Sequence, residues 1–252
     1  QYSGNALLAG LDREVGAGWR LGAYGGTGET DLDVRNRGSR GEVRSRHLGV
    51  YAGSSWGALG LSLGYTHSWH RLEIERTAAF PGFSQALASR YDADGGQVYA
   101  DLGYRFARQG WELEPYVQYA HVKVDAEGFR ERSGIAALQG RGGESRVDLA
   151  TAGLRFAANV AGRGQDQPWL SLRGNVGYRH AGGDQVQHVD MAFDQGPWFG
   201  VASPAITDEA VLAQLGVAAR TSTRSLLELG MSHVESDQAN DTGLNARFTV
   251  NF

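Results

Sequence analysis

The chain has 252 residues, among them 37 Gly, 10 Tyr, 9 Phe and 6 Trp, with no Cys and a formal net charge of −4. The lack of Cys excludes a disulfide scaffold and a thiolate metal site. The small charge, the aromatic content and the 5 prolines exclude a disordered or collagen-like chain. No uncharged apolar stretch reaches the length of about 18 residues that a spanning helix needs, and no segment resembles a signal peptide.

Apolar and polar residues alternate along almost the whole chain, which predicts strands because successive side chains of a strand point to opposite faces. Val98 and Leu102, for example, fall on one face of such a strand, and Asp101 falls on the other. In chain order, eleven strands are predicted over residues 4–13, 18–28, 43–54, 57–72, 91–107, 110–124, 145–158, 168–181, 206–220, 224–235 and 242–252. Most of them have the 9–11 residues, or somewhat more, that a tilted strand needs to cross a bilayer.

Two fold classes contain strands of this kind. A water-soluble β-sandwich also alternates, but its polar face is seldom so rich in Gly and Tyr. A transmembrane β-barrel alternates an apolar, lipid-facing side with a polar interior. We therefore predict an all-β fold, an antiparallel transmembrane up-and-down β-barrel, as a single domain over residues 1–252.

The predicted connections alternate between short and long, as in outer-membrane barrels with periplasmic turns and extracellular loops. The long, polar, Gly-rich connections are predicted at 29–42, 73–90, 125–144 and 182–205. With eleven strands in this order, the chain begins on the extracellular side and ends in the periplasm. Because bacterial barrels have an even strand number, the prediction is a twelve-stranded parent barrel whose first strand lies upstream of Gln1.

The alternate positions that form the polar face of the predicted strands carry charges of both signs. We predict that these side chains line the barrel lumen. They are Arg20, Asp101, Arg105, Glu112, Glu114, Arg155, Arg173, Glu228 and Arg247. One interpretation is a hydrophilic conduit for cargo. The alternative is that the charges form pairs that brace the wall and contact no cargo.

Catalysis, metal binding and nucleic-acid binding find little support. His67 and His70 point to opposite faces of a strand and cannot chelate one ion together. We predict no enzyme activity, no cofactor and no metal site. Dispersed arginines argue against a nucleic-acid partner. The basic run from Arg35 to Glu42 is interpreted as a solvated loop or as a contact for lipopolysaccharide phosphates.

Five sequence blocks, in order, resemble the β-domain, or translocator domain, of autotransporters of the type V secretion pathway. The blocks are ALLAGLDREVGAG from Ala6, WRLGAYGG from Trp19, HLGVYAG from His47, WGALGLSLGYTHSWH from Trp56 and the terminal ARFTVNF. The resemblance covers essentially the whole chain. It implies a twelve-stranded barrel in the outer membrane of Gram-negative bacteria that secretes or displays an N-terminal passenger through a narrow polar lumen.

The resemblance also implies partners. These are the chain's own passenger and linker, the barrel-assembly machinery, and outer-membrane lipid with lipopolysaccharide, around a monomeric barrel. Phe248, Val250 and Phe252 match the family's C-terminal assembly signal. The alternative function is a passive outer-membrane pore or adhesin barrel without a passenger.

Overall fold

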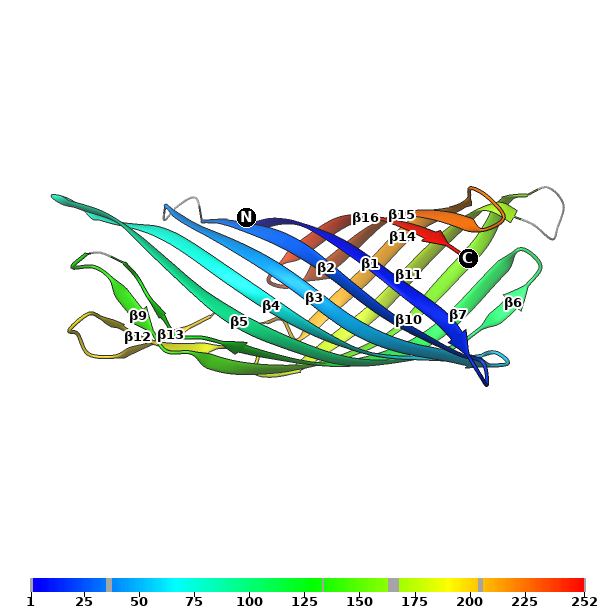
Figure 1. Ribbon diagram of the computed structural model, residues 1–252, viewed down its shortest axis with the longest axis horizontal. Coiled ribbons are helices and arrows are strands. Elements are labelled where there is room, and N and C mark those ends of the chain that lie inside the picture. The colour runs from blue at the N-terminus through cyan, green and yellow to red at the C-terminus, as the bar shows by residue number, and fades with distance from the viewer. Residues whose placement is uncertain (1, 35–37, 133, 163–167, 204–205, 252) are drawn as a thin grey trace.

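The computed structural model describes residues 2–34, 38–132, 134–162, 168–203 and 206–251, and all regular structure in them is β. These residues contain no helix that could cross a membrane. The main sheet is a continuous antiparallel path of eleven strands that curves into an open barrel (Figure 1). In path order, its strands are β1 (Tyr2–Val15), β2 (Trp19–Val34), β3 (Ser39–Trp56), β4 (Leu59–Phe80), β5 (Phe83–Tyr104), β7 (Trp111–Ala126), β10 (Gly143–Gly162), β11 (Pro168–Gly183), β14 (Glu209–Arg220), β15 (Ser225–Ser236) and β16 (Asn240–Val250).

The predicted strand number and alternation are confirmed. Short β6 (Phe106–Arg108) continues the line of β5 after Arg105 and pairs with β7. The apolar face of the barrel is largely exposed in the isolated chain: Leu63, Val98 and Val117 are 39%, 53% and 55% exposed. A surface of this kind is stable only against an apolar environment such as lipid.

The connection predicted at 73–90 is wrong, because β4 and β5 extend through it and pair from Leu59↔Tyr104 to Phe80↔Phe83 without a register shift. Only Pro81 and Gly82 join the two strands. Gly82 has a φ of 83°, which glycine adopts without a steric penalty, and proline suits the position before it in a tight turn. The result is the long hairpin at the left end of Figure 1.

The other long connections are also more ordered than predicted. Strands β2 and β3 extend into 29–42. The segments 125–144 and 182–205 contain a second sheet, here called the upper sheet, with the order β13-β12-β9-β8. Its strands are β8 (Phe129–Arg130), β9 (Leu138–Gly140), β12 (His188–Phe193) and β13 (Phe199–Ala202). Gly-rich composition suggested irregular loops, but strand pairing satisfies many backbone groups of the described residues in these segments.

Tight turns join the strands at the opposite end. Trp56 pairs with Leu59 across a two-residue turn in which Gly57 has a φ of 62°. Glycine at the first position of such a turn matches the right-handed twist of the flanking strands. Ala17 and Gly18 also have positive φ values, in the turn between β1 and β2.

The edges of the main sheet, β1 and β16, run in the same direction, because ten successive antiparallel pairings separate them. Among the described residues, neither strand has a partner on its outer side. The edges approach each other at the long-loop end, where the Tyr2 hydroxyl interacts with Asp241. Both strands therefore keep one row of backbone groups available for pairing.

Tyrosine rings cover glycines on the polar face of the barrel wall. In three directly opposite pairs, Gly22↔Tyr51, Tyr24↔Gly49 and Gly64↔Tyr99, the ring of one strand lies over the glycine of the next. A Cβ added to Gly64 would lie 2.3 Å from the Tyr99 ring. Glycine is needed here for the close approach of the ring, and the ring packs against the wall.

We expect Gly64→Ala to reduce the free energy of unfolding by about 1–3 kcal/mol, because the new methyl group overpacks the Tyr99 site. Urea titration of the barrel in lipid vesicles measures this. Gly60→Ala is the matched control on the same face of β4, since the nearest atom to its added Cβ is 3.9 Å away. Equal stability of the two variants would contradict the packing role of Tyr99.

Candidate functional site

A cluster of charges lies on the polar face where β5, β7 and β10 are neighbours. Register places Arg155 directly opposite Glu114, and one Nη1–Oε1 hydrogen bond of 2.8 Å joins them. The same guanidinium makes two parallel hydrogen bonds to the Asp101 carboxylate, the Nη1–Oδ1 bond being 3.0 Å long. A planar guanidinium matches a carboxylate in this bidentate arrangement, which makes such pairs strong and directional.

The Tyr116 ring packs against the Arg155 guanidinium of this cluster. The Arg155 guanidinium carbon lies 3.8 Å from the centroid of the Tyr116 ring, and that ring covers Gly153 and Gly177. Arg105 adds a second cation, with its Nε 3.7 Å from a Glu114 carboxylate oxygen. The side chains of Asp101 and Glu114 are only 13% and 23% exposed, so each acid depends on these cations rather than on bulk water.

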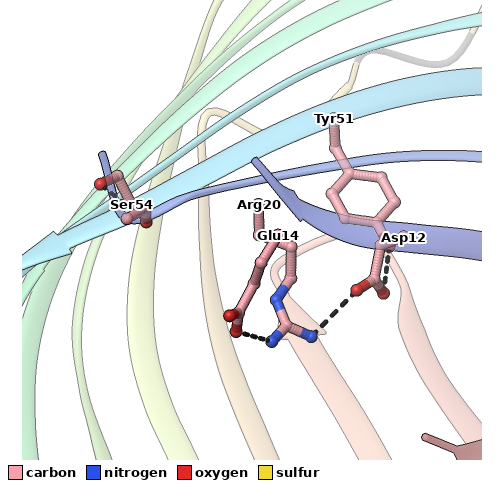
Figure 2. A network of polar contacts seen from close by, with 6 residues as sticks. Asp12, Glu14, Arg20, Tyr51 and Ser54 are labelled. Carbon is pink, nitrogen blue, oxygen red and sulfur yellow. Dashed lines mark hydrogen bonds and ion pairs between the residues drawn. The ribbon is translucent and has the colours of Figure 1, made fainter. Parts of the chain in front are cut away.

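A second cluster lies near the edge strand β1. Figure 2 shows Arg20 of β2 between two acids of β1, with hydrogen bonds of 2.9 Å to Asp12 and 2.6 Å to Glu14. The Tyr51 hydroxyl donates to the other Asp12 oxygen at 2.9 Å. At the same end of β3, the Ser54 hydroxyl donates to the Gly18 carbonyl at the β1–β2 turn. Side chains from β2 and β3 thus hold the polar face of the edge strand.

A third cluster joins the last strands. Glu228 of β15 accepts a hydrogen bond from Arg173 of β11, and Arg247 of β16 lies 3.8 Å from its other oxygen. The side chain of Arg247 is 76% exposed, more than that of any other arginine in the three clusters. Glu112, in contrast, has no ion-pair partner within the described part of the chain.

Eight of the nine predicted charged residues therefore take part in ion pairs, and the structure gathers them into three clusters. Sequence reasoning missed Asp12, Glu14 and Tyr51. Asp12 and Glu14 are two residues apart in the DREV segment, so their side chains point to the same face of a strand. The alternation of polar and apolar residues was therefore enough to predict both as charges of the polar face. The contact of Tyr51 with Asp12 depends on its ring crossing the intervening strand over Gly22, and no local pattern predicts it.

Two histidines also meet on the polar face, nearer the long loops. His47 and Ser68 are joined by a 2.7 Å hydrogen bond, and Ser45 and His70 by one of 2.8 Å. Their imidazole centroids are 6.0 Å apart. His67 lies on the opposite face beside Trp69, as the alternation predicts. Among the described residues, no group of three or more His, Cys, Asp or Glu is arranged to hold a metal ion.

Aromatic residues form two bands on the apolar face. Trp56, Tyr104 and Trp111 lie at the short-turn end, whereas Tyr65 and Trp69 lie further along β4 toward the long loops. Ten residues separate Leu59 from Trp69, which corresponds to a rise of ~25 Å for a strand tilted by about 40°. This rise equals the height of the apolar band of an outer-membrane barrel, about 25 Å, with aromatic girdles at both of its borders.

The predicted assembly-signal residues lie on the last strand. Phe248 and Val250 are 64% and 40% exposed, and their side chains lie on the same face of β16 as that of Leu244. Phe252 lies outside the described residues. The unpaired edge and the apolar side chains of β16 together form a surface that strand addition could recognise.

Comparison with known proteins identifies the family. A family model described as the autotransporter beta-domain matches residues 1–232. The chain belongs to the autotransporter β-domain family. Its whole length is 29% identical to an extracellular serine protease of Serratia marcescens, of which the match covers 24%. Over 62% of its length it is 31% identical to the pertactin autotransporter of Bordetella parapertussis, of which the match covers 17%. The chain thus spans a quarter or less of these relatives.

Solved structures agree on the fold of this autotransporter β-domain. The translocator domain of the autotransporter NalP from Neisseria meningitidis is similar with a TM-score of 0.80 at 14% identity, covering 100% of this chain and 80% of that one. The β-domain of the Bordetella autotransporter BrkA has a TM-score of 0.68 at 20% identity, covering 100% and 91% of the two chains. The domain is an antiparallel β-barrel of the bacterial outer membrane.

We expect Arg155→Met to lower the free energy of unfolding by about 1–3 kcal/mol, because Asp101 and Glu114 lose their shared cation. The value lies below the roughly 3–5 kcal/mol of a fully buried pair because the Arg155 side chain is 34% exposed. Arg173→Met is the control, with a loss below about 1 kcal/mol, since Arg173 is 50% exposed and Arg247 stays beside Glu228. Urea unfolding in vesicles compares them, and equal losses would contradict the central role of Arg155.

Proposed function

We propose that this β-domain is the outer-membrane translocator through which an N-terminal passenger is secreted or displayed. The observation that carries the proposal is a curved sheet whose two faces differ: an apolar face bordered by aromatic bands, and a polar face with three charge clusters. Family membership supports the same function. The S. marcescens relative is described as an extracellular protease, which fits a large exported segment outside the matched region.

The polar face, in this proposal, lines the lumen. Arg20, Asp101 and Arg155 with the other paired charges give a hydrophilic wall without a net field of one sign. A lumen enclosed by twelve strands admits about one helix of 10–12 Å diameter or an extended hairpin. A passenger therefore passes unfolded and folds outside.

Closure of the barrel requires one more strand. β1 and β16 run in the same direction, so one antiparallel strand inserted between them would satisfy both edges and give an even total of twelve strands. Unpaired backbone groups cannot remain in lipid, where each costs several kcal/mol. We infer that a strand supplied from outside residues 1–252 takes this place.

The proposal also includes an orientation and a set of partners. The short turns lie in the periplasm with the C-terminus, and the long hairpin and upper sheet are extracellular. The barrel contacts outer-membrane lipid and lipopolysaccharide, is inserted by the barrel-assembly machinery, and acts without catalysis or a cofactor. Its passenger and linker are the macromolecular partners inside the lumen.

Surface display tests the translocator function. The full-length protein that contains residues 1–252 is expressed in Escherichia coli with an epitope tag ahead of these residues. We expect added protease to remove the tag from intact cells. A tag that stays protected while the barrel is correctly inserted would contradict translocation and favour a passive pore.

The assignment of lipid-facing and lumen-facing sides is tested at two adjacent residues. We expect Leu215→Arg to cost ~2–4 kcal/mol in lipid vesicles because it places a charge near the bilayer midplane. Gln214→Arg places the same charge on the polar face of β14, next to Asn175 and Ser232, and should cost much less. Similar urea midpoints for the two variants would contradict the assignment.

The assembly signal is tested at the C-terminus. Deletion of Phe252, or Phe248→Ser, should reduce the amount of folded barrel in the outer membrane, because the machinery loses an apolar anchor on the edge strand. Heat-modifiable mobility in gels measures folded barrel. Asn251→Ser serves as the control, and unchanged assembly of both apolar variants would contradict the signal.

A further inference from the structure

Two histidine–serine pairs lie next to each other on the polar face of β3 and β4. The register places His47 opposite Ser68 and Ser45 opposite His70, so each strand contributes one histidine and one serine. The two histidines occupy diagonal positions, which in a sheet are about 7–8 Å apart and within reach of aromatic side chains. Their ring centroids are 6.0 Å apart, and the ring planes are inclined by 72°. The two imidazoles therefore meet across the boundary between the strands.

A serine hydroxyl holds each ring in place. His47 Nδ1 and Ser68 Oγ are 2.7 Å apart, and His70 Nδ1 and Ser45 Oγ are 2.8 Å apart. A hydroxyl accepts as well as donates, so each ring can carry its hydrogen on Nδ1 and donate it to serine. That tautomer leaves a lone pair on Nε2. Histidines that bind metals in proteins are held in the same way, with the second ring nitrogen donating to an acceptor.

The Nε2 atoms of both rings are available. Among the described residues, neither of them has a hydrogen-bond partner, and neither ring lies within ion-pair distance of a carboxylate, in contrast to His67 and His121. His70 Nε2 extends over Gly95 of β5, since a Cβ added to this glycine would lie 3.3 Å from the nitrogen. Glycine at this position keeps the space around the nitrogen open.

The wall around the two pairs supplies no further metal ligand. The residues directly beside the pairs on β2 and β5 carry no side chain beyond Cβ; they are Gly26, Gly28, Ala93 and Gly95. The next opposite pair toward the long loops, Val43 and Leu72, is apolar. Within the described ranges, no third His, Cys, Asp or Glu joins the two histidines in an arrangement that could hold a metal ion. An ion bound here would therefore have two protein ligands.

The distance between the rings suits one ion. Imidazoles that share a tetrahedral ion have ring centroids roughly 5 Å apart, given a metal–nitrogen distance of about 2.0 Å. The observed 6.0 Å between His47 and His70 is close to this value, and the χ2 torsion of histidine is broad enough for a small rotation of either ring. Imidazole nitrogen suits zinc, nickel and copper, whereas magnesium and calcium prefer oxygen ligands.

We propose that His47 and His70 bind one divalent transition-metal ion of the Zn²⁺, Ni²⁺ or Cu²⁺ type through their Nε2 atoms. Ser68 and Ser45 position the two rings. Two protein ligands leave at least two positions of a tetrahedral ion for water. On the polar face, which lines the lumen in the proposed function, the ion would be accessible to water and to the side chains of a polypeptide inside the barrel.

The other five histidines provide internal controls, because they lie elsewhere in the fold. Of these, His188 belongs to the upper sheet, and the others lie on the apolar face of the wall: His67, His121, His180 and His233. His67 is the matched control. It lies on β4 only three residues from His70, but it points to the opposite face, where its ring packs against Trp69 at a centroid distance of 4.5 Å.

Zinc titration calorimetry tests the proposal on the full-length protein that contains residues 1–252, folded in detergent and prepared without a polyhistidine tag. We expect His47→Gln and His70→Gln each to weaken the binding of one Zn²⁺ ion by about ten-fold or more, since loss of a supporting partner alone costs about that much. Ser68→Ala should weaken it about ten-fold because the His47 ring loses its acceptor. His67→Gln and Ser62→Ala, a serine on the same face of β4 opposite Asp101, should leave it unchanged.

Electron paramagnetic resonance of added Cu²⁺ provides a second readout. We expect nitrogen couplings from two imidazoles in the unaltered protein and in His67→Gln, and from one imidazole in His47→Gln or His70→Gln. Heat-modifiable mobility in gels confirms that each variant is folded.

Absence of zinc binding to the unaltered protein overturns the proposal, as does equal zinc affinity of the unaltered protein, His47→Gln and His70→Gln, which would place the ion at another site. Metal binding is measured on the folded barrel and not on export. Its absence therefore leaves the translocator function standing, and a failure of surface display leaves the metal site standing.

Discussion

Backbone hydrogen bonding in lipid is the constraint on which this structure depends. Hydrocarbon offers no partner for an N–H or C=O group, so a strand can cross the membrane only when both of its edges are paired. Ten antiparallel pairings meet that requirement for nine of the eleven wall strands and for one side of β1 and of β16. The equal direction of the two remaining edges fits the proposal that one antiparallel strand from outside residues 1–252 completes the barrel.

The curvature of the wall also shapes the residues on its polar face. Rings such as those of Tyr51 and Tyr99 lie over glycines of the neighbouring strands, which keeps bulky side chains close to the wall. Charged side chains are also held close to the wall, since Arg155 lies between Asp101 and Glu114 and against Tyr116. Bracing the wall and providing a polar conduit are therefore compatible roles of the same side chains.

The two ends of the barrel differ because their connections differ. On one side the wall ends at short turns, such as the three-residue turn between β1 and β2 and the two-residue turn between β3 and β4. On the other side, the wall continues upward into the β4–β5 hairpin and the upper sheet, fastened by Arg76 and Glu131, and it is low beside β15 and β16. Among the described residues, this uneven rim leaves β13 paired on one side only.

The sequence by itself determined the strand class, the number of wall strands and the face of most charged residues, because period-two alternation is a local property that both lipid and water enforce. Its signal was weakest in the Gly-rich connections, where pairing is decided by distant partners: Phe129 contacts Tyr91, and β12 pairs with β9 across a gap of about fifty residues in the chain. Only the tertiary structure placed Asp12 beside Tyr51 and grouped the charges into clusters, because those contacts depend on register and curvature across several strands. Within the described part of the chain, β13 pairs with β12 alone, and this too depends on the relative heights of neighbouring strands, a comparison that no single segment of sequence contains.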